Sequence, residues 1–247
     1  MTLFGVALAC VVTLLTSGAA GAQEADSTAV KPVTSPYFVF RTELEDRPGA
    51  PQVAVSRATY KVNFGSRQGV KRGSIFDIYS GRAKEAEGYV GVVRVERVWR
   101  DSAEVRMINL ERKPDADAAL PVDVRFRLFP KYVLLETVHF DAGKPAFTAQ
   151  MNERLRYAAR FILEFPDFPV ALEGHTDNTG KKETNVALGI GHAQEIGRFL
   201  HEIHLIPEDQ MHAVGYADKN PIATNSTLEG RRENRRVDIV MVDRLPD

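Results

Sequence analysis

The residues best suited to binding or catalysis gather in the run Gly174-His175-Thr176-Asp177, which is followed by Gly180. An aspartate carboxylate can hold an ammonium group through a charge-assisted hydrogen bond, worth about 1.5–3 kcal/mol when water is excluded. Free backbone N–H groups at the start of the helix expected after Gly180 favour an anion beside them. These features predict a ligand crevice. The alternative is that Asp177 only holds a turn and binds nothing.

Other groups of reactive residues point to no reaction. His175 and Asp177 suggest hydrolysis, but no serine or cysteine in a nucleophile motif accompanies them, and no second carboxylate is placed as an acid–base partner. His201 and His204 share a helix face, yet a zinc site needs further ligands, and the only cysteine is Cys10. We therefore expect no enzyme activity, no metal site and no organic cofactor.

The elements that must position Asp177 alternate between strand and helix from Tyr132 onward, which indicates an α+β fold. Apolar residues at steps of three and four predict a helix from Phe147 to Ile162 and a second helix with a buried stripe. That stripe comprises Ala193, Ile196, Phe199 or Leu200, and Ile203. Strands are predicted near residues 133–140, 170–174, 211–217 and 237–242, with a short helix at 228–234. Residues 131–247 are thus predicted to form an α/β sandwich with a mixed four-stranded sheet.

The preceding segment shows a different periodicity. Between residues 53 and 129 apolar and polar residues alternate, with strand-like stretches at 75–79, 89–95 and 103–107 separated by glycines. No helical stripe interrupts them, so residues 52–130 are predicted to form a small all-β barrel or sandwich. This segment suggests no chemistry of its own, and Trp99 is expected to pack in its core or at its rim.

The N-terminal segment indicates export. Residues 1–22 carry no charged side chain and combine an apolar run with small residues at Ala20 and Ala22, which is typical of a signal peptide cleaved before Gln23. The alternatives are an uncleaved membrane anchor and a lipoprotein attached through Cys10. Residues 23–51, rich in Ser, Thr, Pro, Ala and Glu, predict a flexible linker. The expected location is the periplasm or the outer membrane.

The overall composition narrows the class of partner. The chain has 247 residues, long enough for two modest domains, and its hydrophobic content of 44% is ordinary for a folded protein. Its 32 basic and 33 acidic side chains nearly balance. This balance gives no reason to expect nucleic acid or an anionic membrane surface as the main partner.

Several separated motifs between Tyr132 and Asp243 resemble the OmpA C-terminal domain family, which includes the Pal lipoprotein and the flagellar stator protein MotB. They occur in the same order as in that family, at residues 173–180, 185–188, 214–216 and 230–238. The family binds peptidoglycan non-covalently through diaminopimelate, whose free end carries an ammonium and a carboxylate. The resemblance implies peptidoglycan as the partner and Asp177 as the residue for the ammonium. It also implies lesser contacts from Thr176, Asn185 and Arg236, with Arg235 as a second possible source of positive charge. The alternative role for Asn185 is to hold the loop.

One position departs from the family pattern. The family has an arginine in a Leu-Ser-x-x-Arg-Ala stretch, whereas this chain has His192 there, within Leu188-Gly189-Ile190-Gly191-His192-Ala193. Arginine is a permanent cation that grips a carboxylate with two bonds, whereas histidine is mostly neutral at pH 7. Two hypotheses follow. Either Asp177 raises the pKa of His192, so that binding strengthens in mild acid, or the domain no longer holds peptidoglycan and is a protein-interaction scaffold.

Overall fold

The computed structural model describes residues 33–43, 59–111, 125–140 and 147–245. The chain divides into two units, Met1–Lys31 and Pro32–Asp247, and every described residue belongs to the second unit. The predicted signal peptide at 1–22 and most of the predicted linker at 23–51 lie outside the described residues. The described part of that linker, residues 33–43, instead contains the strand Val39–Glu43 and the buried ring of Tyr37. Within the described residues, no helix is both long enough and apolar enough to cross a membrane.

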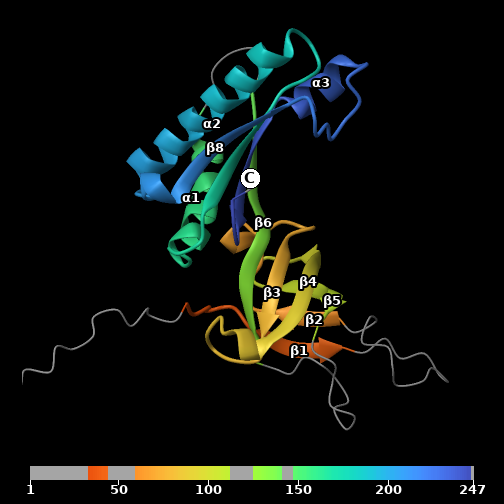
Figure 1. Ribbon diagram of the computed structural model, residues 1–247, viewed down its shortest axis with the longest axis vertical. Helices are drawn as coiled ribbons and strands as arrows, with labels where there is room; N and C mark the ends of the chain where they lie inside the picture. The colour runs from red at the N-terminus through yellow and green to blue at the C-terminus, as the bar shows by residue number, and fades with distance from the viewer. Residues whose placement is uncertain (1–32, 44–58, 112–124, 141–146, 246–247) are drawn as a thin grey trace, which may run out of the picture. The chain divides into compact units, whose positions relative to one another are not determined.

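One nine-stranded sheet runs through the described residues, in the order β1-β2-β5-β4-β3-β6-β9-β7-β8 (Figure 1). Strand β7 pairs in parallel with β8, and the other neighbouring strands pair antiparallel. The strands are β1 (Val39–Glu43), β2 (Thr59–Val62), β3 (Ile75–Tyr79), β4 (Tyr89–Val98), β5 (Ala103–Leu110), β6 (Arg127–His139), β7 (Val170–His175), β8 (Met211–Ala217) and β9 (Arg236–Val242).

The described residues contain three α-helices, all of which follow β6 along the chain. They are α1 (Ala149–Leu163), α2 (Lys182–His204) and α3 (Leu228–Asn234). Helices α1 and α3 begin at threonine caps: the hydroxyl of Thr148 accepts from the Met151 amide, and that of Thr227 from the Gly230 amide. Within the predicted stripe of α2, Ile203, in the last turn of the helix, is 54% exposed rather than buried.

Strand β6 is where the fold differs from the prediction of two separate sheets. Its residues Arg127–Tyr132 pair with β3, and Tyr132–His139 pair with β9. A strand of 13 residues is long enough to serve both partners, so the strands before and after it join one sheet. The separate all-β barrel and the isolated four-stranded sheet are therefore not confirmed. Strand β6 also crosses the predicted boundary at residues 130 and 131, and that division of the chain remains a prediction.

The hydrophobic core likewise contains residues from the strands before β6 and from the strands after it. The ring of Tyr37 stacks on Phe161 of α1, with centroids 5.3 Å apart, and meets Phe64 edge-on at 5.4 Å. Close by, Glu136 of β6 is buried, and Lys71 reaches it at 3.2 Å while Arg154 of α1 donates to it as well. Trp99, in contrast, is 42% exposed and lies at the rim rather than in the core.

Candidate ligand-binding site

Asp177 lies directly beyond the end of β7 and is 6% exposed. One carboxylate oxygen, Oδ1, accepts from the backbone amide of Thr179 at 2.9 Å and from the hydroxyl of the same residue. The other oxygen, Oδ2, accepts from Nη1 of Arg235 at 2.7 Å. Asp177 therefore does hold a turn, as the alternative reading of the sequence proposed, and it is paired with a cation as well.

Asn185 fixes the loop that carries Asp177. It lies in the first turns of α2, and its Nδ2 donates to the backbone oxygens of Asp177 at 3.3 Å and Thr179 at 2.9 Å. Gly180 makes the turn between Asp177 and the start of α2, and its φ of +90° is a conformation that favours glycine. These contacts fit the interpretation that Asn185 holds the loop. Thr176 is also turned inward, since its amide donates to the Ala217 oxygen at 2.9 Å and its hydroxyl to the Asp177 oxygen at 2.9 Å.

A close contact between the backbones of α2 and β7 fixes where α2 starts relative to the Asp177 loop. A Cβ built on Gly174 of β7 would lie 2.1 Å from the carbonyl oxygen of Gly189, and one built on Gly189 would lie 2.8 Å from the oxygen of Gly174. Both residues must therefore be glycine for the helix and the strand to approach this closely. Gly189 therefore allows the start of α2 to lie against the end of β7.

The two neighbouring arginines of the last motif have different partners. Arg235 donates to Asp177, whereas Nε of Arg236 donates to Asp238 Oδ2 at 2.9 Å and its Nη2 to the oxygen of Asn220 at 3.2 Å. Consecutive side chains at the start of a strand point to opposite sides, so only one of the pair can face Asp177. The sequence interpretation selected Arg236. The contact with Asp177 comes instead from Arg235.

His192 occupies the position of the family's arginine on α2 and is 7% exposed. Its ring packs against Phe140, with centroids 3.9 Å apart, and its Nδ1 lies 3.7 Å from Oε2 of Glu195. Burial lowers the pKa of His192, and the nearby Glu195 only partly offsets that effect. The hypothesis that Asp177 raises this pKa is therefore wrong: Glu195 is the carboxylate that acts on His192, and burial outweighs it.

The carboxyl of Asp177 is ionised at neutral pH. Burial pushes its pKa upward, but the hydrogen bonds from Thr179 and the Arg235 guanidinium outweigh burial and leave the pKa below its usual value. The site is thus a shielded carboxylate and a guanidinium in contact. Such a pair can exchange partners with a ligand that carries one charge of each sign.

Comparison with known proteins identifies the domain that holds this pair. Residues 139–235 match the model of the OmpA family, so this part of the chain is an OmpA-family domain. The peptidoglycan-binding protein ArfA of Mycobacterium tuberculosis is 41% identical over 89 residues, which are 36% of this chain and 27% of ArfA. Outer membrane protein Omp38 of Acinetobacter baumannii is 34% identical over 100 residues, which are 40% of this chain and 28% of Omp38.

A peptidoglycan-associated lipoprotein of Agrobacterium fabrum is 26% identical over 106 residues, which are 43% of this chain and 59% of that protein. The chain therefore spans less than two thirds of each of these three relatives. Among solved structures, the peptidoglycan-associated lipoprotein of Burkholderia pseudomallei aligns with a TM-score of 0.39 and 28% identity, covering 42% of this chain and 88% of that one.

Proposed function

We propose that the OmpA-family domain binds peptidoglycan non-covalently, and that the group it recognises is the zwitterionic end of diaminopimelate in the stem peptide. One observation carries the proposal: the shielded ion pair of Asp177 and Arg235 lies where a strand ends and a helix begins, inside the segment that matches the OmpA family. The names of two relatives, a peptidoglycan-binding protein and a peptidoglycan-associated lipoprotein, support the choice of ligand.

Binding in this proposal is an exchange of ion pairs. The ligand's ammonium replaces Arg235 on Oδ2 of Asp177, and Arg235 turns to the ligand's carboxylate. Oδ1 remains on the Thr179 amide, so the carboxylate keeps its orientation during the exchange. The planar guanidinium of Arg235 can grip a carboxylate with two parallel bonds, which a neutral His192 cannot do. Arg235 thus takes the role that the family gives to an arginine on the second helix.

The same proposal sets the cellular role. The protein acts without catalysis, as an exported envelope component that holds the cell wall from the periplasmic side. Residues 1–22 direct its export. The relatives that are outer membrane proteins by name support a location in the envelope.

A second candidate function, the protein-interaction scaffold, is favoured by the internal pairing of the site. Asp177 is fully engaged by Thr179 and Arg235, and His192 is packed between Phe140 and Glu195. A pocket in that condition can be a stable structural feature that takes no ligand. Weak binding of the wild type to cell walls, restored by His192→Arg, would favour this candidate.

Co-sedimentation with purified sacculi tests the main candidate. Asp177→Asn removes the charge but keeps the shape, and we expect it to weaken retention by about 10-fold or more, since a shielded ammonium–carboxylate bond contributes about 1.5–3 kcal/mol. The matched control is Asp209→Asn, an exposed aspartate in the turn before β8. Equal retention of Asp177→Asn and the control would contradict the proposal.

A further inference from the structure

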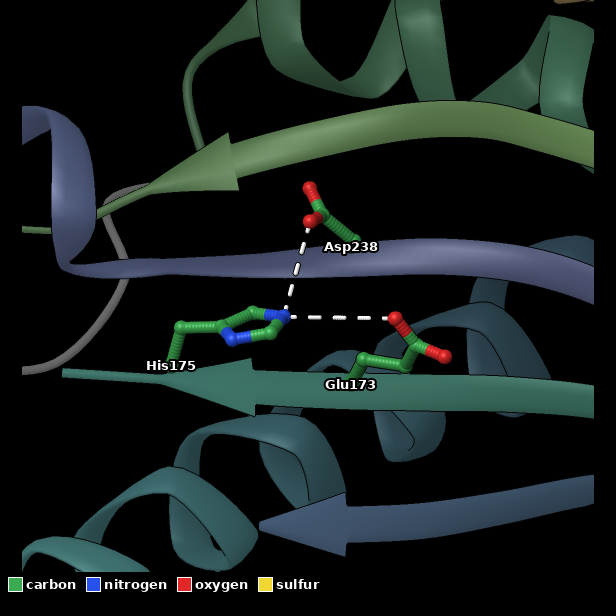
Figure 2. Close-up of side chains that lie close together, drawn as sticks. All are labelled: Glu173, His175 and Asp238. Atoms are coloured by element: carbon green, nitrogen blue, oxygen red, sulfur yellow. Dashed lines mark ion pairs between the residues drawn. The ribbon is translucent and has the colours of Figure 1, made fainter. Parts of the chain in front are cut away.

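A second polar cluster lies on the strands beside the Asp177 loop. Glu173 and His175 are two residues apart on β7 and therefore face the same side of the sheet, and Asp238 of β9 is paired with Glu173 in the register. Figure 2 shows the His175 ring directed between the two carboxylates. Its Nε2 lies 3.6 Å from Oδ2 of Asp238 and 3.9 Å from Oε2 of Glu173.

His175 is the unusual member of this cluster. It is 2% exposed, and neither ring nitrogen has a hydrogen-bond partner among the described residues. Buried polar groups in native proteins are nearly always hydrogen-bonded, so such a ring calls for an explanation. Burial, and secondarily the charge of Arg236, lowers the pKa of His175 to about 4.

We infer that Glu173, His175 and Asp238 form a binding site for a divalent transition metal ion, best suited to Zn²⁺, that ties β7 to β9. The inference is independent of the proposed binding of peptidoglycan. It also revises the expectation from the sequence that the chain has no metal site. The sequence does not reveal this cluster, because Asp238 is 63 residues from His175 along the chain and only the strand register brings the two together.

The distances suit such an ion. One donor atom from each residue can be chosen so that all three lie within 4.8 Å of one another. Two ligands at about 2.0–2.1 Å from a tetrahedral zinc ion are about 3.3–3.4 Å apart. The separations of 3.6 and 3.9 Å around Nε2 exceed this value by about 0.2–0.6 Å, and the two carboxylate oxygens, within 4.8 Å of each other, must also move together. Three protein ligands leave a fourth position of the tetrahedron for water.

Neighbouring groups already orient both carboxylates. The hydroxyl of Tyr132 donates to Oε2 of Glu173 at 3.3 Å, and that of Thr137 donates to Oδ1 of Asp238 at 2.7 Å. Hydrogen bonds of this kind are what hold metal-binding carboxylates in place. Arg236 donates to Asp238 Oδ2 and is the one cation among these contacts, so the two carboxylates and Arg236 together carry a net charge of −1 toward the ion.

The ligand set also selects among metals. One imidazole nitrogen with two carboxylate oxygens suits zinc and neighbouring transition ions, whereas Ca²⁺ takes six to eight oxygen ligands and Mg²⁺ retains most of its water. Mg²⁺ is therefore the appropriate comparison ion. Co²⁺ serves as a spectroscopic probe, because its visible absorption reports the coordination geometry of the site.

The test titrates chelator-treated full-length protein with Zn²⁺ by calorimetry. The expected result is one Zn²⁺ per chain, no comparable binding of Mg²⁺, and affinity at least about 10-fold weaker in His175→Gln. His139→Gln, a half-exposed histidine on β6, is the matched control and should bind like the wild type. Zn²⁺ should raise the Tm of the wild type and the control, but not that of His175→Gln.

A measurement on the wild type alone tests the inference even if the His175→Gln variant does not fold. In ¹⁵N NMR, Zn²⁺ should shift the ring nitrogens of His175 and leave those of His139 unchanged, and Co²⁺ should give the visible spectrum of a four-coordinate site. The inference is overturned if the wild type binds no Zn²⁺, if folded His175→Gln binds it as tightly as the control, or if the His175 resonances do not move.

Discussion

Asp177 and Arg235 are bonded to each other, so a ligand that enters here must compete with an existing ion pair. Breaking a shielded pair is costly unless each charge finds a new partner at once. A zwitterion meets this condition, whereas a simple amine or a simple carboxylate leaves one of the two residues unpaired. At the scale of single residues, the site therefore selects for ligands that carry both charges.

The two arginines give the sharpest test at this scale. Arg235→Gln removes the proposed carboxylate partner, and we expect sacculus binding to fall by about 10-fold or more. Arg236→Gln leaves the Asp177 contact in place, so we expect little loss of binding. It should instead lower the free energy of unfolding, because Asp238 then loses its buried guanidinium partner. Retention on sacculi and urea unfolding of both variants check this.

The reverse pattern would contradict the assignment of Arg235. If Arg236→Gln lost binding while remaining folded, and Arg235→Gln kept it, the residue selected from the sequence would be the ligand contact. Arg232→Gln, an exposed arginine of α3, serves as the control for a general loss of positive charge.

The pH dependence of binding follows from His192. Because burial lowers its pKa below the ordinary value of 6.5, His192 stays mostly neutral in the folded protein from pH 8 down to 6.5 and gains most of its charge at lower pH. We therefore expect sacculus retention to stay constant between pH 8 and 6.5. Strengthening over this range that disappears in His192→Gln would show that the histidine does act as the cation.

At the scale of elements, the contact between α2 and β7 rests on two glycines that face each other. Gly191 lies two residues beyond Gly189 on α2 and differs from it in its surroundings: a Cβ on Gly191 would meet nothing within 4 Å, whereas one on Gly189 would press on the backbone of β7. The two positions form a natural pair for comparison within one helix.

We predict opposite effects on stability for these two glycines. Gly191→Ala should raise the free energy of unfolding by about 0.5–1 kcal/mol, because alanine is the better helix former and has room. Gly189→Ala should lower it by about 1–3 kcal/mol, because the helix must move away from β7. Urea denaturation of the two variants measures both. Equal effects of the same sign would show that the close approach of helix and strand is not needed.

Local patterns in the sequence were sufficient to locate most of these elements. The predicted helix at 228–234 coincides with α3, and the strand at 211–217 with β8. That Arg235 rather than Arg236 contacts Asp177 could not be predicted from the sequence, because it depends on where β9 starts: a shift of one residue turns a side chain to the other side of the strand. The pairing of Glu173 with Asp238 was likewise invisible, since register between distant strands leaves no local signal.

At the scale of the whole unit, the continuity of the sheet was the main feature that sequence did not predict. Alternation in the first half of β6 and the apolar run in its second half suggested two strands in two domains. The structure makes them one strand, with Tyr132 paired to both β3 and β9. Periodicity identifies strands but not their partners, so the division of a chain into sheets cannot be inferred from it.

A shared sheet and a shared core predict cooperative unfolding of residues 32–247. Trp99, the only tryptophan, reports on the strands before β6, whereas far-ultraviolet circular dichroism at 222 nm is dominated by α1 and α2. We expect the two signals to share one urea midpoint, because packing between Tyr37 and Phe161 ties the first strands to α1. Two separated midpoints would instead support independent domains at 52–130 and 131–247.

The most direct test of the central claim is a titration of the protein with a soluble muropeptide that contains diaminopimelate, followed by NMR. A zwitterion held by Asp177 and Arg235 should shift the amide resonance of Thr179 and the guanidinium resonance of Arg235 in the wild type. Asp177→Asn should abolish the response, as should a muropeptide with the free amino group acetylated. If the acetylated and native ligands give the same shifts, or if folded Asp177→Asn binds as tightly as the wild type, the claim is contradicted.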